Sequence, residues 1–574
     1  MSEAVIRWVG GPVVYARAQG TFRIGEAIEV GPQRRPGEVI RLKDDELIGQ
    51  VYEDTTGMRP GDAVRGTGAA MSVRLGPHLL GHIFDGLLRP LDSAETPPVD
   101  TFAFRPLVKA GDQITSGTPI GALPRDGVRQ YILLPPGIAG TVATIAAEGP
   151  HPLDATLCTV TTADGGRYNI GFFQTWPIRK ARPVRERLAA EEPMITGQRI
   201  LDTLFPVARG GQAAIPGGFG TGKTVLQETL AKWCDADVIV YVGCGERGNE
   251  MAEVLREFPK LVDPRSGRGL MERTVIIANT SNMPVAAREA SIYTAVTVGE
   301  YFRDQGLHVA LMADSTSRWA EALREVSGRL GELPGEAAYP AYLGSRLAEF
   351  YERAARVKTL AGADGSLTII GAVSPPAGDF SEPVTSHTKR YVRCFWGLDR
   401  ERAQARFYPA IHPLQSYSEN AGRFAAWWAA RDNSQWQVYR ERLLSLLEAQ
   451  ADLERMARIV GKDSLPPAQQ LTLLCAELVN EAFLRQSAFS EIDRFCSPQR
   501  QTAMLKVILG FITMAEAALA RGVPPQTIAE LDILRRVQRM GEEIGEDRID
   551  QFAQLASALE AAMAGLGKAA PDAA

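Results

Sequence analysis

Residues 217–224 read GGFGTGKT and match the pattern G-x-x-x-x-G-K-[ST] of a phosphate-binding loop. Glycine at these places lets successive backbone N–H groups point inward and surround phosphate oxygens. The ammonium of Lys223 would lie at the β- and γ-phosphates, and the hydroxyl of Thr224 would bind Mg²⁺. The next segment, VLQETLAKW, is predicted to be a helix whose positive N-terminal end faces the anion. The alternative, a glycine-rich turn that matches by chance, is disfavoured by this helix and by the flanking strands.

A second chemical feature is an acid that ends an apolar strand. The segment LHVALMADSTSR places Asp314 directly after such a run. This is the Walker B arrangement, in which a rigid strand holds a carboxylate near the bound Mg²⁺, here through a water molecule. Many buried strands end in aspartate, so Asp314 indicates a metal site only together with the phosphate-binding loop.

A third feature is the polar segment GCGERGNE, residues 243–250, which follows a predicted strand. In a parallel sheet, ligands bind in the loops after the carboxyl ends of the strands. The carboxylate of Glu246 would orient and deprotonate a water in line with the γ-phosphorus, and Arg247, Asn249 and Glu250 would hold its geometry. The alternative is a solvated helix cap, with Glu246 or Glu250 simply near a helix N-terminus. Spacing alone leaves both interpretations open.

A parallel sheet is needed to position these motifs. From about residue 195, apolar strands alternate with longer amphipathic segments, which is typical of βαβ units. The predicted strands are Val238–Val242, Thr274–Ala278, His308–Ala313 and Leu367–Val373. The predicted helices are Met251–Phe258, Val285–Phe302 and Tyr342–Val357.

The regions before and after this predicted sheet have different sequence patterns. Short β-rich runs broken by Gly and Pro fill residues 1–75 and again 112–188, a pattern typical of small barrels or sandwiches. Beyond residue 435 no strand is expected, and apolar residues recur at helical spacing. The helices predicted there are Val438–Val460, Ala468–Phe483, Gln499–Ala520, Ile528–Met540 and Ile549–Leu566.

The predicted fold is multidomain α/β. It has an N-terminal β-barrel, a RecA-like P-loop core with a parallel sheet, a β-rich insert and a C-terminal helical bundle. The boundaries are 1–75 for the barrel, 76–111 with 189–435 for the core, 112–188 for the insert and 436–574 for the helical domain.

Composition excludes several classes. The 574 residues carry a net charge of -5, which does not favour nucleic acid, whose partners are usually strongly basic. The six cysteines have no CxxC spacing, so a zinc ribbon or disulfide scaffold is not expected and a reducing cytoplasm fits. No signal peptide is expected, and the apolar run Val507–Ala515 is far short of the ~20 residues of a membrane helix.

The motifs together resemble the catalytic A (alpha) chain of V-type and A-type rotary ATPases, over nearly the whole sequence. The stretches that carry the resemblance are ITGQRILDTLFPVARGGQAAIPGGFGTGKT, YVGCGERGNEM, ADSTSRWAEALREVSGRLGELPGEAAYPAYLGSRLAEFYERA, GSLTIIGAVSPPAGDFSEPVT and CSPQRQTAMLKVIL. The resemblance implies an enzyme that hydrolyses or synthesises ATP, with Mg²⁺ and ATP or ADP bound, coupled to H⁺ or Na⁺ transport across a membrane.

The resemblance also implies roles for matching residues. Glu246 matches the glutamate that polarises the attacking water, Lys223 the phosphate lysine, and Thr224 and Asp314 the Mg²⁺ site. Arg247 and Arg318 match arginines near the phosphates and the subunit interface. The nucleotide contacts it implies are Gly217, Gly218, Phe219, Gly220, Thr221, Gly222, Lys223, Thr224, Val225, Tyr408 and Phe495. For Tyr408 and Phe495, ordinary core packing stays open as the alternative.

The implied assembly is an alternating hexamer of three A and three B subunits, in which the B subunits supply an arginine finger. Central shaft subunits D and F, a peripheral stalk of E and G that meets the insert, and a membrane sector with a proteolipid ring complete it. The chain is then a peripheral protein at the cytoplasmic face of a membrane, with no transmembrane segment of its own and no nucleic acid partner.

Three departures and two alternatives qualify this interpretation. Tyr408-Pro409 stands where many relatives have Phe-Pro, and His412-Pro413 where Asn-Trp is common, which concerns base stacking and not the chemistry. Thr221 replaces the P-loop cysteine of eukaryotic relatives, so redox inhibition through that residue is not expected. The alternatives are another hexameric motor, such as an export ATPase or a helicase, and a non-catalytic regulatory nucleotide-binding subunit.

Overall fold

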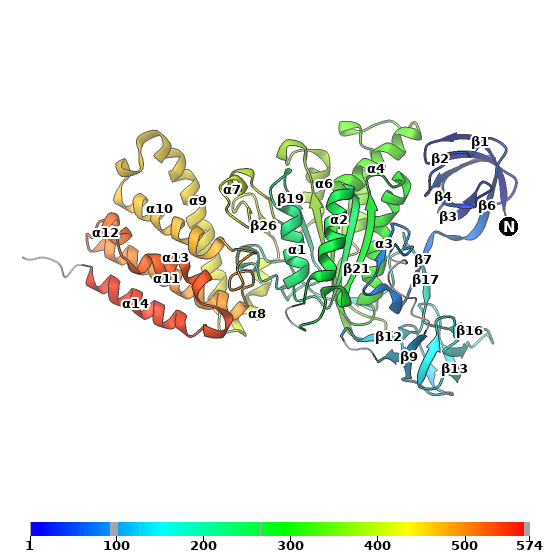
Figure 1. The fold of residues 1–574 in the computed structure, drawn as a ribbon, viewed down its shortest axis with the longest axis horizontal. Coiled ribbons are helices and arrows are strands. Elements are labelled where there is room, and N and C mark those ends of the chain that lie inside the picture. Colours follow the sequence, from blue (N-terminus) through cyan, green and yellow to red (C-terminus); the bar gives the residue numbers. More distant parts are fainter. Residues whose placement is uncertain (1, 92–100, 125–126, 264–265, 567–574) are drawn as a thin grey trace, which may run out of the picture. The chain divides into compact units, whose positions relative to one another are not determined.

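The computed structural model describes residues 2–91, 101–124, 127–263 and 266–566. Its contacts divide the chain into two compact units whose elements are labelled in Figure 1. The first unit comprises Met1–Ala189, Arg209–Ala214 and Ala236–Val392. The second comprises Ala190–Ala208, Ile215–Asp235 and Arg393–Ala574. The predicted phosphate-binding loop therefore belongs to the second unit, and Glu246 and Asp314 belong to the first.

The first unit begins with a closed antiparallel barrel in the order β1-β2-β5-β4-β3-β6. Its strands are β1 (Glu3–Gly10), β2 (Val13–Ala18), β3 (Glu26–Val30), β4 (Arg35–Lys43), β5 (Glu46–Val51) and β6 (Ala63–Ala70). Side chains alternate between the two faces of a strand, so apolar residues such as Val14, Ile28 and Val64 fill the interior. This confirms the predicted N-terminal barrel.

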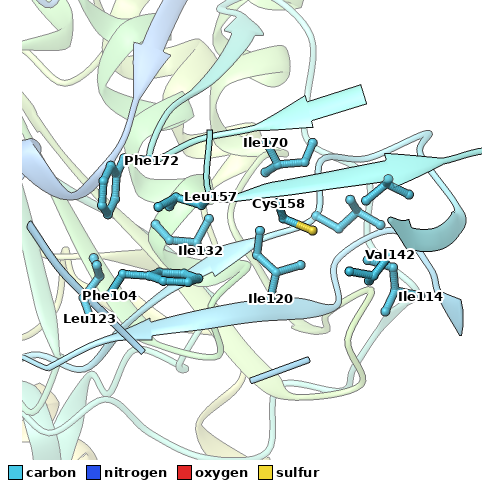
Figure 2. Packing of buried hydrophobic residues seen from close by; sticks show 12 residues of the cluster. Phe104, Ile114, Ile120, Leu123, Ile132, Val142, Leu157, Cys158, Ile170 and Phe172 are labelled. Atoms are coloured by element: carbon cyan, nitrogen blue, oxygen red, sulfur yellow. The ribbon is translucent and has the colours of Figure 1, made fainter. Parts of the chain in front are cut away.

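A second β-rich module follows, made of two four-stranded sheets in the orders β10-β13-β15-β16 and β12-β11-β9-β14. The strands are β9 (Thr101–Pro106), β10 (Gln113–Ile114), β11 (Pro119–Leu123), β12 (Gln130–Leu133), β13 (Gly140–Ile145), β14 (Gly149–Pro152), β15 (Cys158–Thr161) and β16 (Arg167–Ile170). Figure 2 shows their shared core, in which Phe104, Ile120, Ile132 and Cys158 are buried. The module has a hydrophobic core of its own, as expected for an inserted domain.

The main part of the first unit is a parallel sheet in the order β24-β22-β20-β21-β8. Its strands are β8 (Ile83–Phe84), β20 (Val238–Glu246), β21 (Thr274–Thr280), β22 (His308–Asp314) and β24 (Asp364–Val373). Helices α2 (Gly248–Glu257), α3 (Val285–Arg303) and α4 (Thr316–Arg329) connect or follow these strands. The strands are buried along nearly their whole length, as parallel strands covered on both faces are. The predicted strand–helix alternation is confirmed.

Two predicted helices are wrong in extent. The segment Tyr342–Val357 is predicted as one helix, but α5 (Leu343–Tyr351) ends early and β23 (Ala355–Lys358) pairs with β24. The alternating pattern of ARVK suits a strand, and the chain turns at Arg353, whose guanidinium binds Glu300. Ile528–Met540 is likewise divided into α12 (Pro525–Ala529) and α13 (Ile533–Glu543), with a turn at Leu531, whose N–H donates to Ile528 O.

The second unit contains α1 (Lys223–Trp233), two short strands β25 (Cys394–Phe395) and β26 (Tyr417–Ser418), and the C-terminal helices. The long helices are α9 (Trp436–Val460), α10 (Pro467–Val479), α11 (Pro498–Ala520) and α14 (Gln551–Gly565). Among the described residues no strand follows β26, as predicted.

One helix of the described residues, α11, is long and apolar enough to cross a membrane, with a mean hydropathy of 1.8. Half of its apolar window is buried in the protein. Core helices of globular domains meet the same criterion, and α11 packs against α14 and α10. It is therefore assigned to the core of the C-terminal helical domain.

All six cysteines are buried and none is in a disulfide. Burial raises the pKa of the thiols of Cys244, Cys475 and Cys496 to about 12. None of these three is therefore a nucleophile at neutral pH.

Candidate functional site

The glycine-rich loop of the second unit connects the end of β19 (Gln212–Pro216) to the start of α1 at Lys223. Gly220 and Gly222 have φ values of 77° and 86°, which favour glycine at both turns of the loop. The Thr221 hydroxyl donates to Gly218 O at 2.8 Å, and the Lys223 ammonium donates to Gly217 O at 3.0 Å. This is a strand–loop–helix unit of the kind that surrounds phosphates with backbone N–H groups.

Two aromatic side chains lie exposed at or beside this loop. Phe219 is 86% exposed, and Tyr408 is 42% exposed. A Cβ added to Gly222 would lie 3.5 Å from the Tyr408 ring, so that ring lies directly against the loop. Tyr408, one of the two predicted adenine contacts, therefore lies beside the predicted phosphate-binding loop.

The other predicted adenine contact, Phe495, is occupied by protein neighbours. Its ring stacks on Trp233 with centroids 5.2 Å apart and planes 24° apart. On another side it lies so close to Gly197 that an added Cβ would come within 2.2 Å. These contacts agree with core packing, which was the alternative interpretation of Phe495.

Phe489, which is not among the predicted nucleotide contacts, is 92% exposed. Its loop is tied to Tyr408 because Gln486 N donates to Tyr408 O at 2.8 Å. No periodicity distinguishes Phe489 from Phe495 in the segment QSAFSEIDRF. The only available signal was an aromatic residue among small polar ones in a loop.

In the first unit, β20 ends in a bulge that carries Glu246. The pairing of β20 with β21 shifts between Cys244 and Glu246, so Gly245 is the extra residue, with φ of 73°. Ser281 N donates to Glu246 O at 2.9 Å and holds the strand end. Bulges re-aim side chains next to active sites, and here the bulge sets the direction of the Glu246 side chain.

The structure brings Glu246 and Asp314 together at the carboxyl edge of the sheet. Asp314 ends β22 and pairs with Gly243 on β20. Burial raises the pKa of Glu246 to about 8, and the charges of Asp314 and Glu250 act in the same direction. A carboxyl whose pKa is shifted in this way by burial and by neighbouring acids is a candidate for proton transfer.

Two arginines accompany these acids. Arg318, at the start of α4, donates to both carboxylate oxygens of Glu321 at 2.9 and 3.1 Å. That bond raises the pKa of Arg318, and the charges of Glu246 and Glu250 act in the same direction, so Arg318 lies in the field of the acidic group. Arg247 follows Glu246 directly and lies 4.0 Å from Glu250.

Comparison with known proteins identifies the family. The model of the ATP synthase alpha/beta family nucleotide-binding domain matches residues 197–418, and that of the C-terminal domain of V and A type ATP synthase matches 425–528. The alpha/beta barrel-sandwich and β-barrel domain models match residues 96–179 and 7–68. The A subunit of the A-type ATP synthase of Methanopyrus kandleri is 50% identical over 550 residues, covering 93% of each chain. The chain belongs to this family of A-type and V-type ATP synthase proteins.

Other members of this family agree. The corresponding A subunit from Desulfurococcus is 48% identical, covering 94% of this chain and 96% of its own. The V-type ATP synthase alpha chain of Halothermothrix orenii is 48% identical over 97% of each chain. Among solved structures, the assembled ATPase EscN of the enteropathogenic E. coli type III secretion system aligns with a TM-score of 0.65 over 88% of this chain and all of its own. At 24% identity EscN shows the fold alone.

The side chains predicted for the metal fit Mg²⁺ in their chemistry. Thr224 offers a hydroxyl and Asp314 a carboxylate, both hard oxygen donors. No group of three or more His, Cys, Asp or Glu among the described residues could form a metal cage by itself. Mg²⁺ binds few protein oxygens and keeps several waters and phosphate oxygens as its other ligands.

Proposed function

We propose that the chain is the catalytic subunit of a rotary ATPase that hydrolyses or synthesises ATP while H⁺ or Na⁺ crosses a membrane. One observation carries the catalytic assignment: Glu246 follows a strand-end bulge at the carboxyl edge of the parallel sheet, on the strand that pairs with the end of β22 at Asp314. A protein that only bound nucleotide would not need a base of this kind. The printed names of the relatives, which call them ATP synthase subunits or chains, support the same function.

The proposed chemistry is phosphoryl transfer to water, or its reverse. The backbone N–H groups of Gly217–Gly222 and the ammonium of Lys223 bind the phosphates. Thr224 and Asp314 would hold Mg²⁺, which neutralises charge on the transferred phosphoryl group. Glu246 takes the proton of the attacking water, and Arg247 and Arg318 stabilise the charge that develops on the phosphate oxygens.

We propose that Tyr408 and Phe489, rather than Phe495, stack on the adenine. Tyr408 lies against the glycine-rich loop, and Phe489 is exposed on the loop bonded to Tyr408. The Phe495 ring, in contrast, packs against Trp233 and Gly197. Val225 and Phe219, both exposed at the loop, complete the proposed contacts.

The proposed assembly follows from the family. Three copies alternate with three B subunits, which supply an arginine finger worth about 10³–10⁵ in rate. The C-terminal helices (436–574) transmit motion to the shaft subunits D and F, and the β-rich insert (112–188) meets the E and G stalk. The chain is then peripheral, held at the cytoplasmic face of the membrane by its complex with the proteolipid ring.

The test is Glu246→Gln in the assembled complex, with MgATP binding and steady-state turnover measured separately. Turnover should fall by about 10²–10⁴-fold, since general base catalysis contributes that much, while the dissociation constant changes little. Glu253→Gln, an exposed neighbour on α2, is the matched control and should leave both unchanged. Full turnover by Glu246→Gln would support a regulatory role instead, and RNA-stimulated hydrolysis would support a helicase.

A further inference from the structure

Arg288, near the start of α3, lies beneath the bulge that carries Glu246. A Cβ added to Gly245 would come within 2.7 Å of Arg288 Cδ and 2.9 Å of Arg288 Nε. On its other side the same Cβ would meet Arg318 Cβ at 2.9 Å. Gly245 therefore lies between two arginine side chains, one of which would have to shift if Gly245 carried a Cβ.

Hydrogen bonds connect Arg288 to both sides of the bulge. Its Nη2 donates to Ser281 O at 2.9 Å, and Ser281 N in turn donates to Glu246 O at 2.9 Å. Its own carbonyl accepts the Cys244 thiol at 3.4 Å and the Ser291 hydroxyl at 2.8 Å. The residues before and after Gly245 are therefore both held, directly or through Ser281, by Arg288.

The Arg288 guanidinium is buried with one of its donors unpartnered within the part of the chain that the structure describes. Arg288 is only 9% exposed, and its Nε–H has no acceptor among the described residues. A buried donor without a partner destabilises the folded state, whereas an apolar side chain of similar length would fill the same space without that penalty. The side chain that carries this unpartnered donor is also in contact with Gly245, the residue next to the predicted base.

We propose that Arg288 is a positioning residue for catalysis, which fixes the Gly245 bulge and through it the direction of the Glu246 carboxylate. The inference rests on the proposed function, because it assigns to Arg288 an effect exerted through Glu246. The Arg288 side chain packs against Gly245. Its guanidinium also donates to the Ser281 carbonyl, and the Ser281 N–H donates to the Glu246 carbonyl. A misplacement of a reacting group by about 1 Å can lower a rate by about 10²-fold.

The experiment compares Arg288→Met, Arg288→Lys and Glu246→Gln in the assembled complex, measuring kcat, KM, MgATP affinity and melting temperature. Arg288→Met should lower kcat by about 10²-fold and leave KM and affinity within about threefold, because it disturbs the base and not the phosphate-binding loop. Arg288→Lys, which keeps the charge and most of the stem, should recover at least a tenth of the wild-type kcat. Arg303→Lys is the matched control: a buried arginine at the other end of α3, ion-paired with Glu300 and Asp304, that should change melting temperature but not kcat.

A second measurement covers the case in which Arg288→Met does not fold. Gly245→Ala should lower kcat by crowding Arg288 and by its positive φ. The double variant Gly245→Ala with Arg288→Ala should lose less than the product of the losses measured in Gly245→Ala and in Arg288→Ala alone. Unchanged kcat in Arg288→Met, or single losses that simply multiply in the double variant, would overturn the proposal. If Glu246→Gln keeps full turnover, the proposed function itself fails. If Glu246→Gln is inactive but Arg288→Met and Gly245→Ala are fully active, only this inference fails.

Discussion

The Tyr241 hydroxyl donates a hydrogen bond to Asp314 Oδ2 at 3.3 Å, between adjacent parallel strands of the sheet. Both residues are almost completely buried. Tyr241 belongs to strand β20. Four residues later the same strand contains the bulge at Gly245, directly before Glu246. One strand thus supports both acids of the proposed reaction.

Tyr241→Phe should lower kcat about three- to tenfold without unfolding the protein. The change removes one hydrogen bond, with a net value of about 0.5–1.5 kcal/mol, and leaves the ring in place. Because Asp314 is the proposed Mg²⁺ partner, the Mg²⁺ concentration for half-maximal rate should rise as well. Rate against free Mg²⁺ is the measurement. Tyr301→Phe, a buried tyrosine on α3, is the control, and an equal Mg²⁺ shift in that variant would contradict the assignment.

Glu246→Gln should make the nucleotide-free protein more stable than the wild type in alkaline solution. The folded-state pKa of Glu246, about 8, lies above its ordinary value of 4.5. Wild-type stability from this group is therefore complete below pH 4.5, declines as pH rises and is lost above pH 8. The melting temperature of Glu246→Gln, measured with EDTA present, should exceed that of the wild type by roughly 2–4 °C at about pH 9 and match it at about pH 4.5.

The exposed Glu253→Gln substitution provides the baseline for that comparison. Its melting temperature should follow the wild type at every pH. A Glu246→Gln advantage that is constant from about pH 5 to about pH 9 would show that the carboxyl does not carry the raised pKa.

Phe489→Ala should weaken ATP binding, and Phe495→Ala should weaken folding. Stacking of a base on an aromatic ring contributes about 1–3 kcal/mol, so the ATP dissociation constant should rise roughly 5- to 160-fold in Phe489→Ala. Phe495→Ala removes a ring packed between Trp233 and Gly197 and should lower the melting temperature with little change in affinity. The measurements are ATP titration and thermal denaturation of both variants. Weaker ATP binding in Phe495→Ala, with unchanged binding in Phe489→Ala, would show that Phe495 is the adenine contact instead.

Arg179→Met should destabilise the first unit strongly. The Arg179 guanidinium binds the carboxylates of Glu38 in the barrel and Glu289 on α3, at 2.9 and 2.7 Å, and both acids are buried. Removing the shared cation leaves two buried like charges, a change that typically costs about 3–5 kcal/mol. Calorimetry should show an earlier transition than in Arg17→Met, which removes an exposed partner of Asp45 and should change stability by less than about 1 kcal/mol. Equal transitions in the two variants would refute the role of the buried group.

The motifs and elements that were predicted from the sequence are those that depend on residues close together along the chain. The loop ending in Lys223 and Thr224 was recognisable because its spacing is fixed by contacts of neighbouring residues with a phosphate. Asp314 was recognisable because an apolar run precedes it directly. The barrel, the parallel sheet and the helical end were predicted from periodicities that each arise within one element.

What could not be predicted depends on residues far apart in sequence. The packing of Phe495 depends on Trp233 and Gly197, which lie far earlier in the chain. The contact of Arg288 with Gly245 likewise requires the fold, since α3 looks like any buried helix. The end of α5 was predicted wrongly because a distant acid, Glu300, binds Arg353 just beyond it.

The burial of all six cysteines has a practical consequence for following this molecule in motion. A single cysteine introduced at an exposed position would be the one readily modified by maleimide dyes, with the native residues left in place. Fluorophores could then be attached to the barrel, the insert or the helical end in turn, and distances between them recorded while the enzyme turns over.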